Sequence, residues 1–357
     1  MSAIDDIRER VREASAQGRA LRIRGAGSKD FYGQALEGEV LDTRAHRGIV
    51  SFEPTELVVT ARCGTPLAEL EAELAGQRQM LAFEPPAFGD AATVGGMVAA
   101  GLSGPRRAAA GAVRDYVLGV TMVDASGEIN RFGGQVMKNV AGYDVSRLLC
   151  GSMGVLGLIA EVSLKVLPVP SAQTSLAITM SEADALRHLN EWAGQPLPIS
   201  ASAWHGSTLQ LRFSGAAAAV EAARARFVQS YGAAAIEPEA ADAYWTGVRE
   251  QANDFFAGDE PLWRLSLPSV APAVVVPGRQ LIEWGGALRW LKTDASAAEV
   301  RAAVHGVGGN ATLFRGGDKS AGAFEPLSSP MAALHRRLKR EFDPRGVFNP
   351  HRMYPEL

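Results

Sequence analysis

Two segments rich in small residues restrict what this chain can fold into. The first is Arg24-Gly-Ala-Gly-Ser-Lys29, which directly follows a predicted strand at 21–24, and the second is 88–111, which contains Gly95-Gly96. Glycine lets a ligand approach the backbone closely, and N–H groups gathered in turns or at helix N-termini bind phosphate. A run of small residues is costly in chain entropy unless another group must come close. We therefore expect both segments to form phosphate-binding loops.

The first loop matches neither of the two common phosphate motifs. Position 30 is Asp, so Gly-x-Gly-x-x-Gly is not met, and Ser28 precedes Lys29, so the Lys-Ser/Thr ending of the P-loop is missing. Taken alone, this loop also fits a tight turn between a strand and its neighbour. The second segment supports a phosphate site more strongly, because a turn does not explain Gly95-Gly96 within a run of small residues.

Composition excludes several kinds of partner. The chain has 357 residues and a formal net charge of −3, with basic residues spread along it, so we expect neither nucleic acid nor an anionic membrane as partner. It has no apolar run of about 18 residues and no signal-peptide pattern, so we expect a cytoplasmic protein without a transmembrane segment. Cys63 and Cys150 are too few for a disulfide framework or an iron–sulfur cluster, and we interpret both as buried small side chains.

The N-terminal part reads as a helix followed by strands. Apolar residues at spacings of three and four predict a helix over 3–17. Thr65 is expected to cap a second helix whose first residue is Pro66. Alternation of apolar and polar residues predicts a half-buried strand over 158–166. Two prolines follow this strand, and we place a domain boundary at 170.

The rest of the chain alternates strands and helices. Capping boxes begin helices at Ser181 and Ser296, and 281–291 is predicted as a hairpin that turns at Gly285-Gly286. The order of elements predicts an antiparallel sheet with helices on one face, followed by a last helix at 328–341. The predicted fold class is therefore α+β.

Several motifs, taken in their order, resemble one family. Five of them are similar to the FAD-binding domain of the vanillyl-alcohol oxidase type, also called the PCMH type: Arg24-Gly-Ala-Gly-Ser28, Thr93-Val-Gly-Gly96, Gly111-Ala-Val-Arg-Asp115, Gly151-Ser-Met-Gly-Val-Leu-Gly157 and Phe342-Asp-Pro-Arg-Gly-Val-Phe-Asn-Pro350. Lys138-Asn-Val-Ala-Gly-Tyr-Asp144 narrows the resemblance to the branch that contains glycolate oxidases and D-lactate dehydrogenases. Gly104-Pro-Arg-Arg107 and Trp284-Gly-Gly-Ala-Leu-Arg-Trp290 resemble the smaller FAD-binding subunits of bacterial glycolate oxidases.

The resemblance implies a domain organisation and a function. It implies a two-part PCMH-type FAD-binding domain over 1–170, an α+β cap domain over 171–325, and a segment 326–357 that returns to the FAD domain. The implied protein is a redox subunit of a multi-subunit glycolate oxidase, which oxidises glycolate to glyoxylate and passes electrons to partner subunits. Those partners are a larger FAD-linked subunit and an iron–sulfur subunit, and the complex could associate peripherally with a membrane.

Two other functions stay open at this point. One is a self-sufficient FAD-dependent dehydrogenase that acts on a small 2-hydroxy acid such as D-lactate. The other is a structural or assembly subunit that has no turnover of its own.

The resemblance also implies where FAD binds. Relatives that attach flavin covalently often have a histidine in the first loop or a cysteine nearby, where this chain has Ser28 and Lys29, so non-covalent FAD is expected. The residues that match the family's cofactor positions are Arg24, Gly25, Ala26, Gly27, Ser28, Lys29, Asp90, Ala91, Ala92, Thr93, Gly95, Gly96, Met97, Gly101, Ser103, Gly157, Ile159, Glu161 and Asn349.

No motif identifies the catalytic residues. Oxidation of a 2-hydroxy acid by a flavin requires a group that holds the carboxylate, and arginine does so best because its fork binds both oxygens. The candidates are Arg264, Arg289 and Arg315, although each also fits a salt-bridged surface arginine, and the first two fit stacking on a tryptophan.

Two further features have more than one interpretation. His305 lies where larger relatives have a paired-histidine metal signature, but no second histidine follows, so we expect a helix C-terminal histidine and no catalytic metal. The segment Lys138–Asp144 either positions groups near the flavin or begins a helix in which Gly142 allows close packing.

Overall fold

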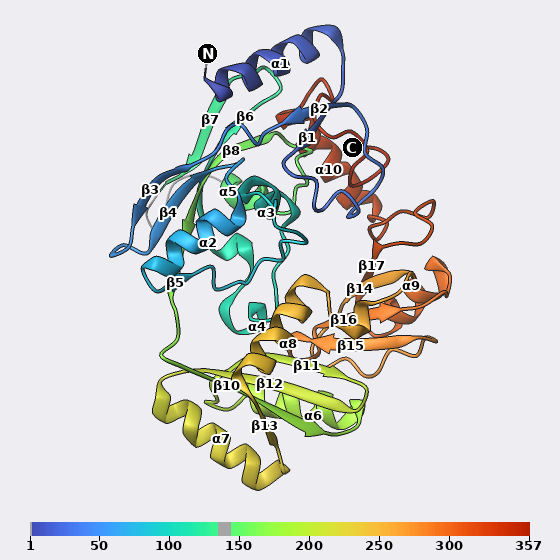
Figure 1. Cartoon of the computed structure of the whole chain (residues 1–357). Coiled ribbons are helices and arrows are strands. Elements are labelled where there is room, and N and C mark those ends of the chain that lie inside the picture. Colours follow the sequence, from blue (N-terminus) through green and yellow to red (C-terminus); the bar gives the residue numbers. More distant parts are fainter. Residues whose placement is uncertain (1, 135–143) are drawn as a thin grey trace. The chain divides into compact units, whose positions relative to one another are not determined.

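The chain forms two compact units in the computed structural model, which describes residues 2–134 and 144–357. Unit 1 consists of the described residues of Met1–Leu102, Ala112–Pro168 and Pro326–Leu357, and unit 2 consists of Ser103–Gly111 and Val169–Glu325 (Figure 1). The C-terminal segment thus returns to the N-terminal unit, as predicted for this fold class. Within the two described ranges, no helix combines the length and hydropathy needed to cross a bilayer.

Unit 1 is built on a five-stranded antiparallel sheet with the order β3-β4-β8-β6-β7. Its strands are β3 (Ile49–Glu53), β4 (Val58–Arg62), β6 (Val117–Val123), β7 (Ile129–Gly133) and β8 (Leu158–Lys165). The central strand β8 was predicted to be half-buried, and its polar residues Glu161 and Lys165 are indeed partly exposed, but Ser163 is not. Ser163 is buried and shares a 2.8 Å hydrogen bond with Thr60 of β4, so even a polar position of β8 lies inside. The hydroxyl of Ser163 is therefore buried as one of a hydrogen-bonded pair, which the alternation in the sequence did not indicate.

A small parallel pair of strands carries the first glycine loop. β1 (Leu21–Arg24) pairs with β2 (Glu39–Asp42). The N-terminal helix α1 (Ala3–Gln17) has the bounds that the sequence predicted for it. The apolar stripe of α1 packs into one core with both strands and the C-terminal segment: Ile7, Val11, Ala14, Leu21, Leu41, Val347 and Phe348. The end of the chain thus lies beside the strand that enters the first loop.

Short helices complete unit 1. They are α2 (Leu67–Gly76), α3 (Val94–Ala100), α5 (Val145–Leu148), α10 (Ser329–Phe342) and the 3₁₀ turn η1 (Val113–Asp115), with two short strands β5 (Gln79–Met80) and β9 (Leu167–Pro168). Thr65 does not cap α2, because Pro66 occupies the N-cap position. The Thr65 hydroxyl instead accepts a hydrogen bond from the Gly48 N–H at 2.9 Å, so tertiary contact replaces the expected local one.

Unit 2 contains an eight-stranded sheet with the order β13-β10-β12-β11-β15-β16-β14-β17, in which every pair is antiparallel. The strands are β10 (Ala172–Thr179), β11 (Ile199–His205), β12 (Thr208–Gly215), β13 (Ala234–Ile236), β14 (Leu262–Ser266), β15 (Arg279–Glu283), β16 (Leu288–Lys292) and β17 (Asn310–Arg315). The helices are α4 (Arg107–Ala110), α6 (Glu182–Ala193), α7 (Ala217–Tyr231), α8 (Pro238–Glu250) and α9 (Ala297–Gly306), with 3₁₀ turns η2 (Asp254–Phe256) and η3 (Trp284–Gly286).

Helices cover both faces of this sheet, although the sequence predicted only one. α6 and α7 pack through Leu189 and Phe227 against strand residues such as Leu211. α8 packs through Trp245 against Ala201 and its neighbour two positions on, Ala203. These alanines point to the face opposite Trp204, and their small side chains leave room for a helix there.

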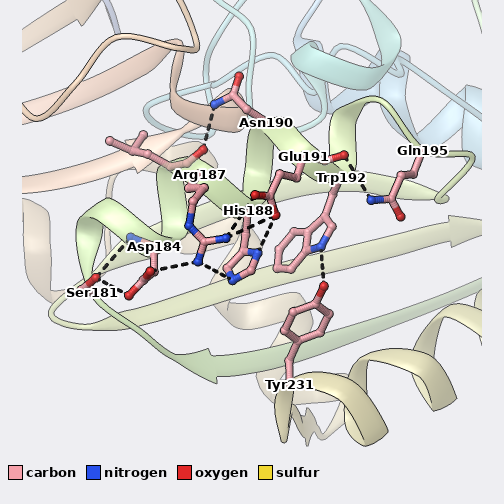
Figure 2. A network of polar contacts seen from close by, with 10 residues as sticks. Ser181, Asp184, Arg187, His188, Asn190, Glu191, Trp192, Gln195 and Tyr231 are labelled. Atoms are coloured by element: carbon pink, nitrogen blue, oxygen red, sulfur yellow. Dashed lines mark hydrogen bonds and ion pairs between the residues drawn. The ribbon is translucent and has the colours of Figure 1, made fainter.

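The helix α6 is held by a network of polar contacts (Figure 2). Ser181 caps it by accepting from the Asp184 N–H at 3.1 Å, as the capping box predicted. His188 contacts Glu191 through Nδ1 at 3.1 Å and stacks on Trp192 with ring centroids 5.2 Å apart. The Trp192 indole in turn donates to the Tyr231 hydroxyl at 3.0 Å, which joins α6 to α7. These contacts give His188 a structural role.

The segment 103–111 belongs to unit 2, whereas the sequence analysis grouped it with residues 1–170. The Trp284 indole donates a hydrogen bond to the Gly104 carbonyl at 3.0 Å. The Arg107 guanidinium lies 4.4 Å from the centre of the Trp284 ring, and buried Arg106 donates to the Gln173 side chain at 3.2 Å. This placement depends on residues about 180 positions away in the chain, so local patterns could not predict it.

Candidate cofactor site

The first glycine loop presents a row of unused backbone donors. Within the described part of the chain, the N–H groups of Gly25, Ala26, Gly27 and Ser28 donate no hydrogen bond. Gly27 has φ +79°, and a Cβ there would collide with the Arg24 guanidinium. Residues 25–28 are half-buried, and successive N–H groups in a glycine turn form a concavity that binds anions, so this loop is suited to an acceptor with several oxygens.

The second glycine segment was predicted to form a phosphate-binding loop, but its N–H groups donate hydrogen bonds within the protein. At the start of α3, the N–H groups of Val94 and Gly95 donate to the backbone carbonyls of Thr65 and Cys63 at 2.9 and 2.8 Å. The Gly96 N–H donates to the hydroxyl of Thr93, the N-cap, at 3.3 Å. These three donors are therefore satisfied within the protein. Gly95 is required because a Cβ would lie 2.6 Å from the Cβ of Cys63.

A third turn, 151–157, is joined to the C-terminal segment by Asn349. The Asn349 side chain donates to the Met153 carbonyl at 2.6 Å and accepts from the Ile23 N–H at 2.7 Å. A Cβ on Gly154 would lie 2.6 Å from Asn349 Nδ2, so only glycine fits against this amide. Asn349 itself has φ +41°, a conformation that asparagine tolerates better than most residues.

These segments line one pocket in unit 1. The predicted cofactor residues in its wall are Arg24, Gly25, Ala26, Gly27, Ser28, Lys29, Thr93, Gly95, Gly96, Gly157, Ile159 and Asn349. Three loops that are far apart in the sequence thus converge, and the unpaired N–H groups of the first loop belong to the same wall.

The other predicted cofactor residues lie outside the wall. Ala92 and Met97 are buried in the core, and Asp90 and Ala91 are exposed. Gly101 ends α3, Glu161 lies 3.8 Å from Arg62 on the sheet, and Ser103 belongs to unit 2.

Sequence reasoning missed several residues of the wall. These are Ile23, Asp30, Leu36, Thr43, Cys63, Ala99, Ala100, Met153, Gly154 and Arg352. Arg352 follows the C-terminal motif by two positions, Met153 and Gly154 lie within the motif 151–157, and Ala99 and Ala100 lie within the second glycine segment, so proximity to a motif was a signal for these residues. Ile23 and Asp30 directly flank the first loop, whereas Leu36, Thr43 and Cys63 join the wall only through the tertiary fold.

Positive charge gathers around the first loop. Arg24 pairs with Asp30 at 3.0 Å, and the Lys29 ammonium donates to the Ala87 carbonyl at 3.1 Å. Arg352 is buried, and burial lowers its pKa to about 10, so it stays charged at neutral pH. The pocket therefore combines backbone donors with guanidinium groups, which is the chemistry of a diphosphate site.

The cysteine in the wall is unreactive. Burial raises the pKa of the Cys63 thiol to about 12, so the thiol stays protonated. Cys150 is shifted in the same way, also to about 12. A protonated thiol is a poor nucleophile, which agrees with non-covalent flavin.

The three candidate arginines lie in unit 2 in different surroundings. Arg289 is fully buried, and its guanidinium donates to the carbonyls of Gly286, Pro272 and Ala271. Arg315 donates to the Gln251 side chain at 2.8 Å. Among the described residues, the Arg264 guanidinium donates a hydrogen bond only to the Ser266 hydroxyl, at 3.3 Å, and it lies 5.3 Å from the centre of the Trp284 ring. Arg289 is therefore a structural group, and Arg264 keeps donors for a ligand.

His305 does not have the capping role that the sequence predicted, and most of the segment Lys138–Asp144 cannot be compared with its prediction. His305 contacts the Glu325 carboxylate at 3.0 Å instead of capping its helix, and no cluster of metal-ligating side chains occurs within residues 2–134 and 144–357. The segment Lys138–Asp144 lies outside the described residues except for Asp144, which caps α5 by accepting from the Arg147 N–H at 3.1 Å.

Comparison with known proteins defines the class to which this pocket belongs. Residues 2–133 match a family model described as an FAD binding domain. Along 98% of its length, the chain is 49% identical to glycolate oxidase subunit GlcE of Escherichia coli (strain K12), of which it covers 97%. The chain belongs to this family of FAD-binding oxidoreductase subunits.

More distant similarities agree with the fold. A D-lactate dehydrogenase of Anaerostipes hadrus is 38% identical over 36% of this chain and 27% of that protein. A solved structure of alkyldihydroxyacetonephosphate synthase superposes with a TM-score of 0.69, covering 98% of this chain and 76% of the other, at 15% identity. That likeness supports the fold alone.

The residues present fit FAD. The four unpaired N–H groups of the first loop and the surrounding cations match a diphosphate, and the glycines leave the backbone open to it. FAD is the cofactor of the matched family, so the pocket of unit 1 is the candidate FAD site.

Proposed function

We propose that this chain is the FAD-binding redox subunit of a multi-subunit glycolate oxidase, which oxidises glycolate to glyoxylate and passes electrons to partner subunits. The observation that carries the proposal is the pocket of unit 1, where unpaired N–H groups of residues 25–28 meet the turn 151–157. The 49% identity with GlcE, which is named as a glycolate oxidase subunit, supports the substrate.

Several residues of the chain would hold the cofactor. The N–H groups of residues 25–28 donate to the diphosphate, and Asn349 keeps the turn 151–157 against β1. Gly157 and Ile159, which match the family's cofactor positions, line the same pocket. When bound, FAD supplies the two-electron acceptor for oxidation of the substrate C–OH group.

Arg264 is the best candidate to hold the substrate carboxylate. Trp284 has φ +53°, a strained value for a bulky residue, and Arg107 and Arg264 both lie over its ring. Strain of this kind persists only where surrounding contacts impose it, and it occurs often at functional sites. The stacked Arg264 fork is oriented while its donors stay largely unused, which suits a carboxylate.

The partners are also part of the proposal. A GlcD protein of Bacillus subtilis is 41% identical over 26% of this chain, and both GlcE and GlcD are named as glycolate oxidase subunits. We propose a larger FAD-linked subunit and an iron–sulfur subunit as partners, because two protonated cysteines cannot carry a cluster here. Cytoplasmic location with peripheral membrane association through the complex belongs to the same proposal.

The visible spectrum of the purified chain tests the proposal. A flavin band should appear after reconstitution with FAD, and it should bleach under anaerobic glycolate only when the partner subunits are present. Bleaching of the isolated chain by glycolate or D-lactate would instead support a self-sufficient 2-hydroxy acid dehydrogenase. Absence of any flavin band, with an intact complex that needs this chain, would support an assembly subunit.

A further inference from the structure

Arg352 is a buried cation in the wall of the candidate FAD site. Its exposed fraction is 5%, and it comes from the C-terminal segment, beyond the last helix α10. It lines the same pocket as Gly25, Ala26, Gly27 and Ser28, whose N–H groups have no partner in the described residues.

The Arg352 guanidinium holds the turn that follows the first loop. It donates to the carbonyls of Lys29, Asp30, Tyr32 and Gln34, at 3.3 Å for Lys29 and 3.0 Å for Asp30. The Gln34 N–H donates back to the Arg352 carbonyl at 3.0 Å. One side chain thus fixes the path of residues 29–34 and, through it, the direction of the preceding N–H groups.

The charge of Arg352 has no carboxylate partner within the described residues. Four other buried cations have a carboxylate partner: Lys339 contacts Asp343 at 2.7 Å, Lys292 contacts Glu260 at 2.8 Å, Arg301 contacts Glu325 at 3.8 Å and Arg289 contacts Glu182 at 3.9 Å. Asp30 acts electrostatically on Arg352, but its carboxylate forms its ion pair with Arg24, at 3.0 Å. A buried charge without a counter-charge is strongly unfavourable, so an anion is expected to complete this site.

We propose that Arg352 is the counter-charge and the positioning residue of the diphosphate site. Its guanidinium holds the first loop open with the N–H groups of residues 25–28 aligned, and the diphosphate of the dinucleotide neutralises its charge. This inference rests on the proposed FAD site. It goes beyond that site because it makes the C-terminal segment part of phosphate recognition.

Binding of ADP to the apoprotein tests this inference without any turnover. ADP carries the diphosphate of FAD but no flavin, and its dissociation constant is measured by calorimetry at several salt concentrations. We expect Arg352→Gln to weaken ADP binding by about 10-fold or more and to flatten its salt dependence, because one charged contact is lost. Arg345→Gln is the matched control, since exposed Arg345 lies on the same segment, donates to Ser15 and does not line this pocket.

Arg352→Lys separates charge from packing. A lysine buried at this place has a lowered pKa, so its ADP affinity should fall as pH rises from 7 to 8.5, while that of the wild type, in which the pKa of Arg352 is about 10, stays level over the same range. This readout holds even if Arg352→Gln fails to fold.

Three outcomes are distinguishable. Unchanged ADP affinity and salt dependence in Arg352→Gln would overturn the inference, and so would an Arg352→Lys protein whose affinity does not change with pH. Failure of the folded wild type to bind either ADP or FAD would overturn the proposed FAD site itself.

Discussion

The side-chain amide of Asn349 donates a hydrogen bond to the backbone carbonyl of Met153 across 2.6 Å. The same amide accepts from the Ile23 N–H, so it connects β1 with the turn 151–157. Asn349 is in turn placed by Asp343, whose buried carboxylate accepts from the N–H groups of Val347 and Phe348 at 2.9 and 2.8 Å. The C-terminal motif is therefore a scaffold for the candidate FAD site.

Replacing Asn349 by alanine should release FAD. The change leaves the Ile23 N–H and the Met153 carbonyl without partners and frees the turn 151–157 from β1, at a cost of about 1–3 kcal/mol per buried group. The flavin-to-protein ratio after gel filtration and the urea midpoint measure both effects. Asn130→Ala is the control, because Asn130 makes one hydrogen bond, to Asp124, on the hairpin β6–β7. Full flavin content in Asn349→Ala would contradict this role.

The first loop should tolerate no side chain at Gly27. Gly27→Ala places a Cβ against the Arg24 guanidinium in a left-handed conformation, so FAD affinity should fall by about 10-fold or more. Gly18→Ala is a matched control, since Gly18 has φ +63° but nothing within 4 Å of its Cβ position. Both variants should lose about 1 kcal/mol of stability, and only the first should lose flavin fluorescence quenching. Equal FAD affinity in both variants would count against the loop.

The buried pair of Lys339 and Asp343 should dominate the stability of unit 1. Lys339 also donates to the carbonyls of Val155 and Phe348 at 2.7 and 2.9 Å, although burial lowers its pKa. Lys339→Met should therefore cost about 3–5 kcal/mol in urea unfolding, because Asp343 is left as an uncompensated buried carboxylate. Arg340→Met, on the exposed side of α10, should change stability by less than about 0.5 kcal/mol. A cost similar to that of the control would show that the pair is dispensable.

Both cysteines should resist alkylation in the native protein. Burial raises each thiol pKa from 9 to about 12, so neither ionises at pH 8.5. Mass spectrometry after iodoacetamide treatment should find no label in native protein and two labels in urea. The unfolded thiols ionise from pH 9, so their contribution to stability is present below that pH and declines as pH rises toward 12. Rapid labelling of Cys63 in native protein would contradict its burial.

Replacing Arg264 should slow flavin reduction without loss of stability, whereas replacing Arg289 should lower the stability of unit 2. Arg264→Gln should slow anaerobic flavin reduction by glycolate about 100-fold in the assembled complex and leave the melting temperature nearly unchanged, because its one hydrogen bond joins Ser266. Arg289→Gln should destabilise unit 2 by about 3 kcal/mol, because the carbonyls of Ala271 and Pro272 lose their donors. Stopped-flow absorbance and thermal unfolding separate the two. Normal reduction in Arg264→Gln would remove it as the carboxylate group.

Local sequence patterns predicted much of the framework. The helix α1, the capped starts of α6 and α9 and the hairpin of β15 and β16 all follow from short-range periodicity, capping and turn chemistry. The order of the glycine motifs was specific enough to indicate the FAD-binding family, which the comparison with GlcE confirms.

The remaining features depend on contacts between residues far apart in the sequence, so local patterns could not predict them. The use of the Gly95 and Gly96 N–H groups depends on partners elsewhere in the fold, such as the Cys63 carbonyl. The burial of Ser163 depends on Thr60, about 100 positions away. Arg352 carries no motif of its own, and its contact with residues 29–34 exists only because the chain end returns to unit 1.

By itself the sequence determined the local elements, the glycine positions and the family of this protein, because these depend on neighbours along the chain and on the order of motifs. The tertiary structure alone decided that the N–H groups of residues 25–28 stay unpaired within the described part of the chain, that Arg352 is buried in the wall of the pocket, and that residues 103–111 belong to unit 2. The physical reason is that hydrogen bonds and charges are satisfied by groups close in space, and local patterns do not specify which distant segments meet.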